Sequence, residues 1–208
     1  MAEQITFGKI RTSRTELIDI TKAWLALSLA FTFAFSGMSI LSGRFSIGTL
    51  FSIPFLIFFV ISLLTAGIGF LFHELGHKFV AQRYGCAAEF RAFDQMLYIA
   101  VGLAIVVGFI FAAPGAVMIA GNVTRRENGI ISAAGPLVNF FLGMLFLAAG
   151  FVAPYLGAIT DIGFRINLWL GLFNMIPFGN FDGIKILHWN RYVWTAMVAF
   201  GVYFVFFF

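Results

Sequence analysis

The residues best suited to chemistry are the two histidines and the carboxylate of His73-Glu74-Leu75-Gly76-His77, at the end of an apolar run. From Phe45 to Phe72, 28 positions pass without a charged residue. On a helix, residues i and i+4 share a face, so both imidazoles can reach one Zn²⁺ ion. Glu74 lies next to that face and can take a proton from a water activated by a metal. Because ionisable groups are costly within a span, a metal site is favoured over the alternative, two solvated histidines at a helix end.

A catalytic zinc ion needs three protein ligands and one open position. The third ligand should be His, Asp, Glu or Cys, and the only histidine outside the motif is His188. Asp182 is a second candidate, within the polar stretch 174–183 (NMIPFGNFDG) that interrupts an apolar run. Pro177 frees a backbone carbonyl there, and polar side chains need partners in hydrocarbon. Taken alone, the stretch is also consistent with a kinked helix that carries incidental polar residues.

HExxH followed by Asn-x-x-Pro-x-x-x-x-Asp-Gly resembles the site-2 protease family of intramembrane zinc metalloproteases. The stretch 134–139 (AGPLVN), which lies between the two motifs, is a further match. The resemblance covers about 61–187, the family's three-helix catalytic core. It implies an enzyme, a zinc metalloendopeptidase that hydrolyses peptide bonds within or beside transmembrane segments of its substrates.

The resemblance also implies roles for individual residues. The zinc ligands would be His73, His77 and Asp182. Glu74 would activate the water, and Asn174 would help to hold the oxyanion or the substrate backbone. The Gly-Pro pair at 135–136 is interpreted as structural.

The composition predicts a membrane protein. Of the 208 residues, 61% are hydrophobic and 11% charged, and the mean hydropathy is +0.98. A soluble domain carries about 25% charged residues. The net charge of +4 is better explained by membrane orientation than by nucleic acid. We therefore expect a transmembrane protein substrate and the lipid bilayer as partners, and no nucleic acid.

We predict an all-α polytopic protein with five to six transmembrane segments around the three-helix core, plus a small β-hairpin or re-entrant element. Residues 1–22 are assigned to a cytoplasmic segment, with a surface helix over Thr15–Lys22, and 23–208 to one membrane-embedded domain. The helix of the second apolar run is expected to continue towards Gln82. The apolar runs are 23–41, 46–72, 96–113, 130–152, 166–187 and 192–208.

The arrangement of charge predicts a multi-pass cell-membrane protein with a cytoplasmic N-terminus. If 96–113 does not cross, eleven Lys and Arg residues lie inside and only Arg44 and Arg165 outside, which follows the positive-inside rule. The site then lies near the cytoplasmic side. If His73 and Asp182 meet, their spans must run the same way, so one of the two intervening runs must fail to cross. The run 96–113 is shorter and interrupted by glycine, so we predict that it is the re-entrant hairpin.

The sequence departs from the smallest members of the resembled family at this run, which is inserted where a short β-hairpin is expected. Residues 115–119 (GAVMI) have the alternating small and β-branched character of a strand in such a hairpin. The insertion affects the expected topology more than the chemistry.

Two other classes of function were weighed. A metal transporter or channel usually carries acidic or histidine residues along several spans, whereas here they gather at one depth. A non-catalytic scaffold would be expected to have lost a motif residue, and all are present. The substrate's identity and the oligomeric state are not indicated by the sequence.

Overall fold

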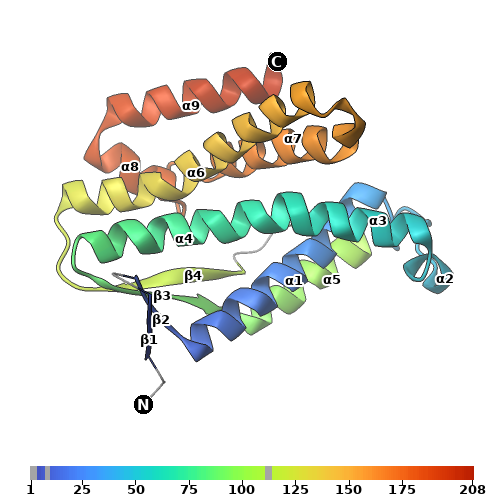
Figure 1. Ribbon diagram of the computed structural model, residues 1–208, viewed down its shortest axis with the longest axis horizontal. Helices are drawn as coiled ribbons and strands as arrows, with labels where there is room; N and C mark the ends of the chain where they lie inside the picture. Colours follow the sequence, from blue (N-terminus) through green and yellow to red (C-terminus); the bar gives the residue numbers. More distant parts are fainter. Residues whose placement is uncertain (1–3, 8–9, 111–113) are drawn as a thin grey trace.

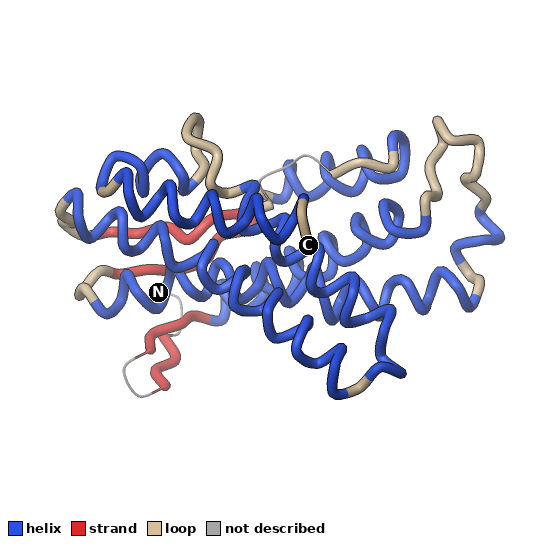
Figure 2. The backbone as a smooth tube through the Cα atoms, turned by 90° about the horizontal axis from the view of Figure 1, so that it is seen from above, coloured by secondary structure: helices blue, strands red, loops and turns tan. Residues whose placement is uncertain are grey.

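The computed structural model describes residues 4–7, 10–110 and 114–208. Most of the chain is helical, and two short two-stranded sheets accompany the helices (Figure 1). Figure 2 shows the strands gathered in one half of the molecule. The elements are β1 (Gln4–Phe7), β2 (Ile10–Ser13), α1 (Arg14–Ser36), α2 (Ile47–Leu50), α3 (Ile53–Ser62), the π-helical turn η1 (Leu63–Gly67), α4 (Ile68–Arg83), β3 (Ala87–Ala92), α5 (Asp94–Val107), β4 (Gly115–Ala120), α6 (Arg125–Val152), the 3₁₀ turn η2 (Pro154–Leu156), α7 (Gly157–Phe173), α8 (Asp182–Trp189) and α9 (Arg191–Phe206).

Within the described residues, four helical stretches are long and apolar enough to cross a membrane, which indicates a membrane protein. They are Arg14–Ser36, Ile53–Arg83, Arg125–Val152 and Pro154–Phe173. Helices α5 and α9 are apolar but shorter. The predicted number of five to six spans therefore stays a prediction.

Helix α1 begins earlier than the sequence pattern indicated. The hydroxyl of Ser13 accepts the backbone N–H of Glu16 at 3.2 Å and caps the first turn. No glycine or proline follows until Gly37, whose left-handed φ of 65° ends the helix. The separate surface helix predicted over Thr15–Lys22 is therefore not formed, because those residues are the first turns of α1.

The helix that carries HELGH continues through α3, η1 and α4 to Arg83, as predicted for the second apolar run. Ser52 caps its start by accepting the N–H of Phe55. The π turn widens the helix at Leu63, whose carbonyl accepts the indole N–H of Trp24 on α1 at 3.2 Å.

Helix α5 runs beside α1 in the same direction. Near its start, Asp94 accepts a hydrogen bond from the Lys22 ammonium at 2.7 Å. Near its end, the carbonyl of Ile105 accepts the N–H of Ile40 at 2.9 Å, just beyond the end of α1. Helix α5 therefore extends as far as α1 does in this direction.

The chain then returns to where α5 began. The N–H of Phe93 donates to the carbonyl of Pro114 at 3.0 Å, so the two residues that flank the segment containing α5 are neighbours. The segment therefore leaves and returns at the same end of the helix bundle, and its predicted re-entry without crossing the membrane stays a prediction. Residues 111–113 of the predicted run lie outside the described residues.

The strand predicted over 115–119 is β4, and it pairs antiparallel with β3, which the sequence pattern did not reveal. The pair of strands lies along the C-terminal half of α4 (Figure 1). The excursion through α5 is thus inserted between the two strands of one hairpin.

Helices α4, α6 and α7 pack together, with α6 antiparallel to α4 and α7 parallel to it (Figure 1). The predicted fifth run, 166–187, is not one kinked helix, because α7 ends at Phe173 and α8 begins at Asp182. Pro177 cannot donate a helical hydrogen bond, and Gly179 adopts a left-handed φ of 63°. The break allows Asp182 to turn towards α4.

Candidate metal and catalytic site

Two histidines of α4 and one aspartate of α8 meet inside the protein. The Nε2 atoms of His73 and His77 are 3.0 Å apart. The Oδ2 atom of Asp182 lies 3.3 Å from Nε2 of His73 and 3.1 Å from Nε2 of His77. The three side chains form a group that can hold a metal ion, and each residue is at most 8% exposed.

The outer nitrogen of each imidazole is held by α6. Nδ1 of His73 lies 2.6 Å from Oδ1 of Asn139, and Nδ1 of His77 lies 2.8 Å from the carbonyl of Ile131. Both partners are acceptors, so each Nδ1 carries its proton and each Nε2 is left with a free lone pair. The helix pair α4–α6 therefore orients both rings for metal binding.

Asn139 is itself part of a buried polar network. Its side-chain amide donates to the carbonyl of Gly69 at 3.0 Å and to Oδ1 of Asn167 at 3.1 Å. Asn167 donates in turn to the carbonyl of Gly163 at 2.9 Å. Asn139 ends the stretch 134–139, but no role was predicted for it. An asparagine side chain in an apolar helix needs hydrogen-bond partners, and this requirement could have marked Asn139 in the sequence.

Gly135 leaves the space in which an ion can sit. A Cβ atom at this position would lie 2.4 Å from Nε2 of His77 and 2.6 Å from Nε2 of His73. Such distances are far below van der Waals contact, so a side chain here would fill the place towards which the imidazole lone pairs point. Gly135 thus lines the site directly, beyond the structural role predicted for it.

Asp182 is placed by the polar stretch that precedes it. The N–H of Gly183 donates to the carbonyl of Asn174 at 2.7 Å, which closes the loop between α7 and α8. A Cβ atom on Gly183 would lie 2.1 Å from the carbonyl oxygen of Met175, so only glycine allows this approach. The indole N–H of Trp194 on α9 also donates to that carbonyl, at 2.9 Å.

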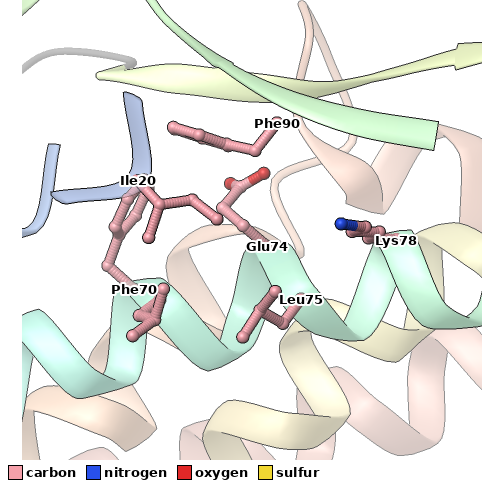
Figure 3. A pocket seen from close by; sticks show the side chains of 7 residues that line it. Ile20, Phe70, Glu74, Leu75, Lys78 and Phe90 are labelled. Carbon is pink, nitrogen blue, oxygen red and sulfur yellow. The ribbon is translucent and has the colours of Figure 1, made fainter. Parts of the chain in front are cut away.

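Glu74 projects from α4 towards the strands. Its carboxylate shares a pocket with residues of α1, α4 and β3 (Figure 3). The lining side chains are those of Ile20, Phe70, Leu71, Leu75, Lys78 and Phe90. Glu74 therefore lies next to the metal-binding group in sequence, in largely apolar surroundings.

Two known proteins are similar to the chain in sequence. A protein of Methanocaldococcus jannaschii named "putative zinc metalloprotease" is 41% identical over 194 residues, covering 90% of this chain and 91% of that protein. The chain belongs to this family of zinc metalloproteases. A longer protein of the same organism, named zinc metalloprotease, is 28% identical over 138 residues, which are 63% of this chain and 34% of that protein. No family model matches the chain, and no solved structure matches it significantly.

Zinc is the cofactor of this metalloprotease, and the three side chains suit it. Histidine nitrogen and carboxylate oxygen are common zinc ligands at about 2.0–2.2 Å, so two ligands in a tetrahedral arrangement are about 3.3 Å apart. The observed separations of 3.0, 3.1 and 3.3 Å are close to that value. Three protein ligands would leave the fourth position open, which is typical of catalytic rather than structural zinc sites.

The other two candidates from the sequence, His188 and Asn174, are not members of the metal-binding group found among the described residues. The side-chain amide of Asn174 donates to the carbonyl of Leu170 at 2.9 Å, within its own helix. The amide nitrogen carries two N–H donors, so this hydrogen bond leaves one for the role predicted for Asn174 at the oxyanion.

Proposed function

We propose that the protein is an intramembrane metalloprotease of the site-2 type, which cleaves peptide bonds within or beside transmembrane segments. The observation that carries the proposal is the meeting of Asp182 with His73 and His77, which lie on a helix long and apolar enough to cross a membrane. Soluble proteases do not need to embed their site in such helices. A buried polar site within an apolar bundle suits a substrate that is itself in the bilayer.

The proposed setting is the cell membrane, crossed several times, with the N-terminus in the cytoplasm. Strands β1 to β4, the starts of α1, α6 and α9, the end of α4, and α8 all lie towards one end of the helices (Figure 1). Eight of the 13 Lys and Arg residues belong to these segments, as the positive-inside rule requires of a cytoplasmic face: Arg11, Arg14, Arg83, Arg91, Arg125, Arg126, Lys185 and Arg191. The site would then open near the cytoplasmic side, from which water can reach it.

In the proposed reaction, His73, His77 and Asp182 hold the zinc ion. Bound zinc supplies a Lewis acid that lowers the pKa of water and polarises a carbonyl. Glu74 accepts the proton of the attacking water and donates it to the amine that leaves when the C–N bond breaks. Asn174 is the side-chain donor that we assign to the oxyanion or the substrate backbone.

The substrate has to be unwound before it can react, because the carbonyl groups of a helix are occupied by hydrogen bonds. An extended segment can form backbone hydrogen bonds with the edge of a strand. Strand β4 lies along α4, which carries Glu74, and supplies such an edge. We therefore propose that substrate is held beside β4 during cleavage.

The test is cleavage of a single-span reporter in liposomes. Its transmembrane segment should carry helix-breaking residues at its centre and a different tag on each side. We expect zinc-loaded wild type to cut inside the apolar segment, as located by mass spectrometry, and Glu74→Gln to leave the reporter intact. Cuts confined to the soluble flanks, or equal cutting by Glu74→Gln, would count against intramembrane proteolysis.

A further inference from the structure

A buried ion pair joins α1 to α4 beside the site. Nζ of Lys78 lies 2.6 Å from Oε2 of Glu16, and the two residues are 2% and 0% exposed. Lys78 directly follows His77 and is one of the eleven Lys and Arg residues that the charge pattern places on the cytoplasmic side. Charges removed from water are costly unless they are well paired, and an apolar pair of similar size would often be at least as stable. The ionic pair therefore calls for a role beyond stability.

The Glu16 carboxylate also bonds to a third element, the strand β3. The backbone N–H of Phe90 donates to Oε1 at 2.8 Å, and the hydroxyl of Thr12 donates to Oε2 at 2.7 Å. Both oxygens are thus occupied. One carboxylate connects the start of α1, the catalytic helix α4 and the strand β3.

These bonds lie on the outer edge of β3. Phe90 is opposite Val117 in the antiparallel pair, and its N–H is donated to Glu16 and not across to β4. The carbonyl of Ala88, two residues earlier, accepts from the side chain of Gln82 on α4 at 3.0 Å. At alternate positions of an antiparallel strand, the backbone N–H and C=O groups point away from the partner strand. On β3 these outward groups bond to the side chains of Glu16 and Gln82, which therefore occupy this edge.

The other edge of the sheet belongs to β4. Because Phe90 and Val117 do not exchange hydrogen bonds, the backbone groups of Val117 also point away from the partner strand, and its N–H faces the Glu74 carboxylate. Within the part of the chain that the structure describes, no third strand pairs with β4. A free strand edge is a template for another extended chain.

We propose that Glu16, held by Lys78, is a positioning residue: it fixes the β3–β4 sheet against α4, so that the free edge of β4 is presented beside Glu74. The proposal rests on the proposed function, in which an extended substrate binds along β4. Glu74, Lys78 and Phe90 line one pocket, so the sheet and the catalytic helix are in contact where the pair acts (Figure 3). Substrate would be admitted at β4 because side chains occupy the edge of β3.

The experiment compares zinc-loaded wild type with Glu16→Leu/Lys78→Met, a pair that leaves no buried charge unpaired. Fluorescein-labelled casein, an unfolded chain, serves as substrate in detergent, and zinc content verifies the fold. Glu16→Gln, which keeps the side-chain shape, is the second variant. The matched control is Glu89→Gln, which removes a partly exposed carboxylate of β3 that pairs with Arg91.

We expect KM for casein to rise about tenfold in the double variant and severalfold in Glu16→Gln, with kcat within about twofold of wild type. The control variant Glu89→Gln should have the KM and kcat of wild type. Loss of strand binding raises KM, whereas general loosening of the site would lower kcat. KM within twofold of wild type in the zinc-bound variants, or a loss confined to kcat, would overturn the proposal.

Amide hydrogen exchange separates this proposal from the proposed function. In the double variant, exchange over residues 87–92 and 115–120 should be at least about tenfold faster than in wild type, with α6 unchanged. If zinc-loaded wild type cleaves neither casein nor the liposome reporter, the proposed function fails and exchange alone decides the positioning role. Unchanged exchange in the strands would refute that role.

Discussion

Oδ1 of Asn139 lies 2.6 Å from Nδ1 of His73, so a residue of α6 orients the first histidine of the metal-binding group. The two residues are 66 positions apart. Partners of this kind fix the tautomer and the direction of a ligand ring, and their loss typically costs about 10–100-fold in metal affinity. The network around Asn139 therefore belongs functionally to the metal site.

Replacing Asn139 by Ala should lower zinc affinity by about 10–100-fold, because the His73 ring loses the acceptor that holds it. The measurement is zinc competition against a fluorescent chelator. Asn128→Ala is the control, since Asn128 is an exposed residue of the same helix. Equal affinities for the Asn139 variant and wild type would mean that His73 is oriented by something else.

Gly135→Ala should abolish zinc binding without unfolding the helices. The added methyl would sit 2.4 Å from Nε2 of His77, in the space left for the ion. Metal content after zinc loading measures the effect, with circular dichroism as the check on folding. Gly102→Ala, where a Cβ meets nothing within 4 Å, should bind zinc like wild type. Full zinc occupancy in Gly135→Ala would place the ion elsewhere.

Glu74→Gln should keep zinc while losing cleavage. A general base contributes typically 10²–10⁴-fold to rate, and Glu74 is not one of the three residues that form the metal-binding group. Zinc content and casein cleavage are measured on the same preparation. Cleavage by Glu74→Gln at more than about a tenth of the wild-type rate would contradict the role of Glu74 in proton transfer.

Zinc should stabilise the fold, because the intact group of three ligands exists only when α8 is docked on α6 and brings Asp182 to the two histidines of α4. Binding at a concentration about 100 times Kd adds about 2.7 kcal/mol to the free energy of unfolding. For a protein of this size that corresponds to a rise in Tm of about 5–10 °C. Chelation should reverse the rise in wild type. A similar zinc-dependent rise in Asp182→Ala would contradict the ligand assignment.

The metal-binding residues were largely predictable because they lie in short sequence motifs. The i, i+4 pair of histidines places two imidazoles on one face whatever the helix packs against. Asp182 could be paired with them only through a resemblance between motifs. The side chains that support the site could not be predicted, because Asn139 and Ile131 are set by the packing of α6 on α4.

The fold was predictable where hydropathy decides it. The long apolar runs became helices, and the strand over 115–119 was recognised from its β-branched alternation. The partner strand β3 contains Glu89 and Arg91, which mask any apolar pattern. The pairing of Glu16 with Lys78, 62 positions apart, has no local signature, and neither does the packing of α5 beside α1.

The measurement that tests the central claim most directly is metal content of the detergent-purified protein. Wild type should be compared with His77→Ala, Asp182→Ala and the control His188→Ala. We expect about one zinc per chain in wild type and in His188→Ala, and its loss in the other two variants. No metal in zinc-loaded wild type, or a metal content indifferent to Asp182, would contradict a site built from both motifs.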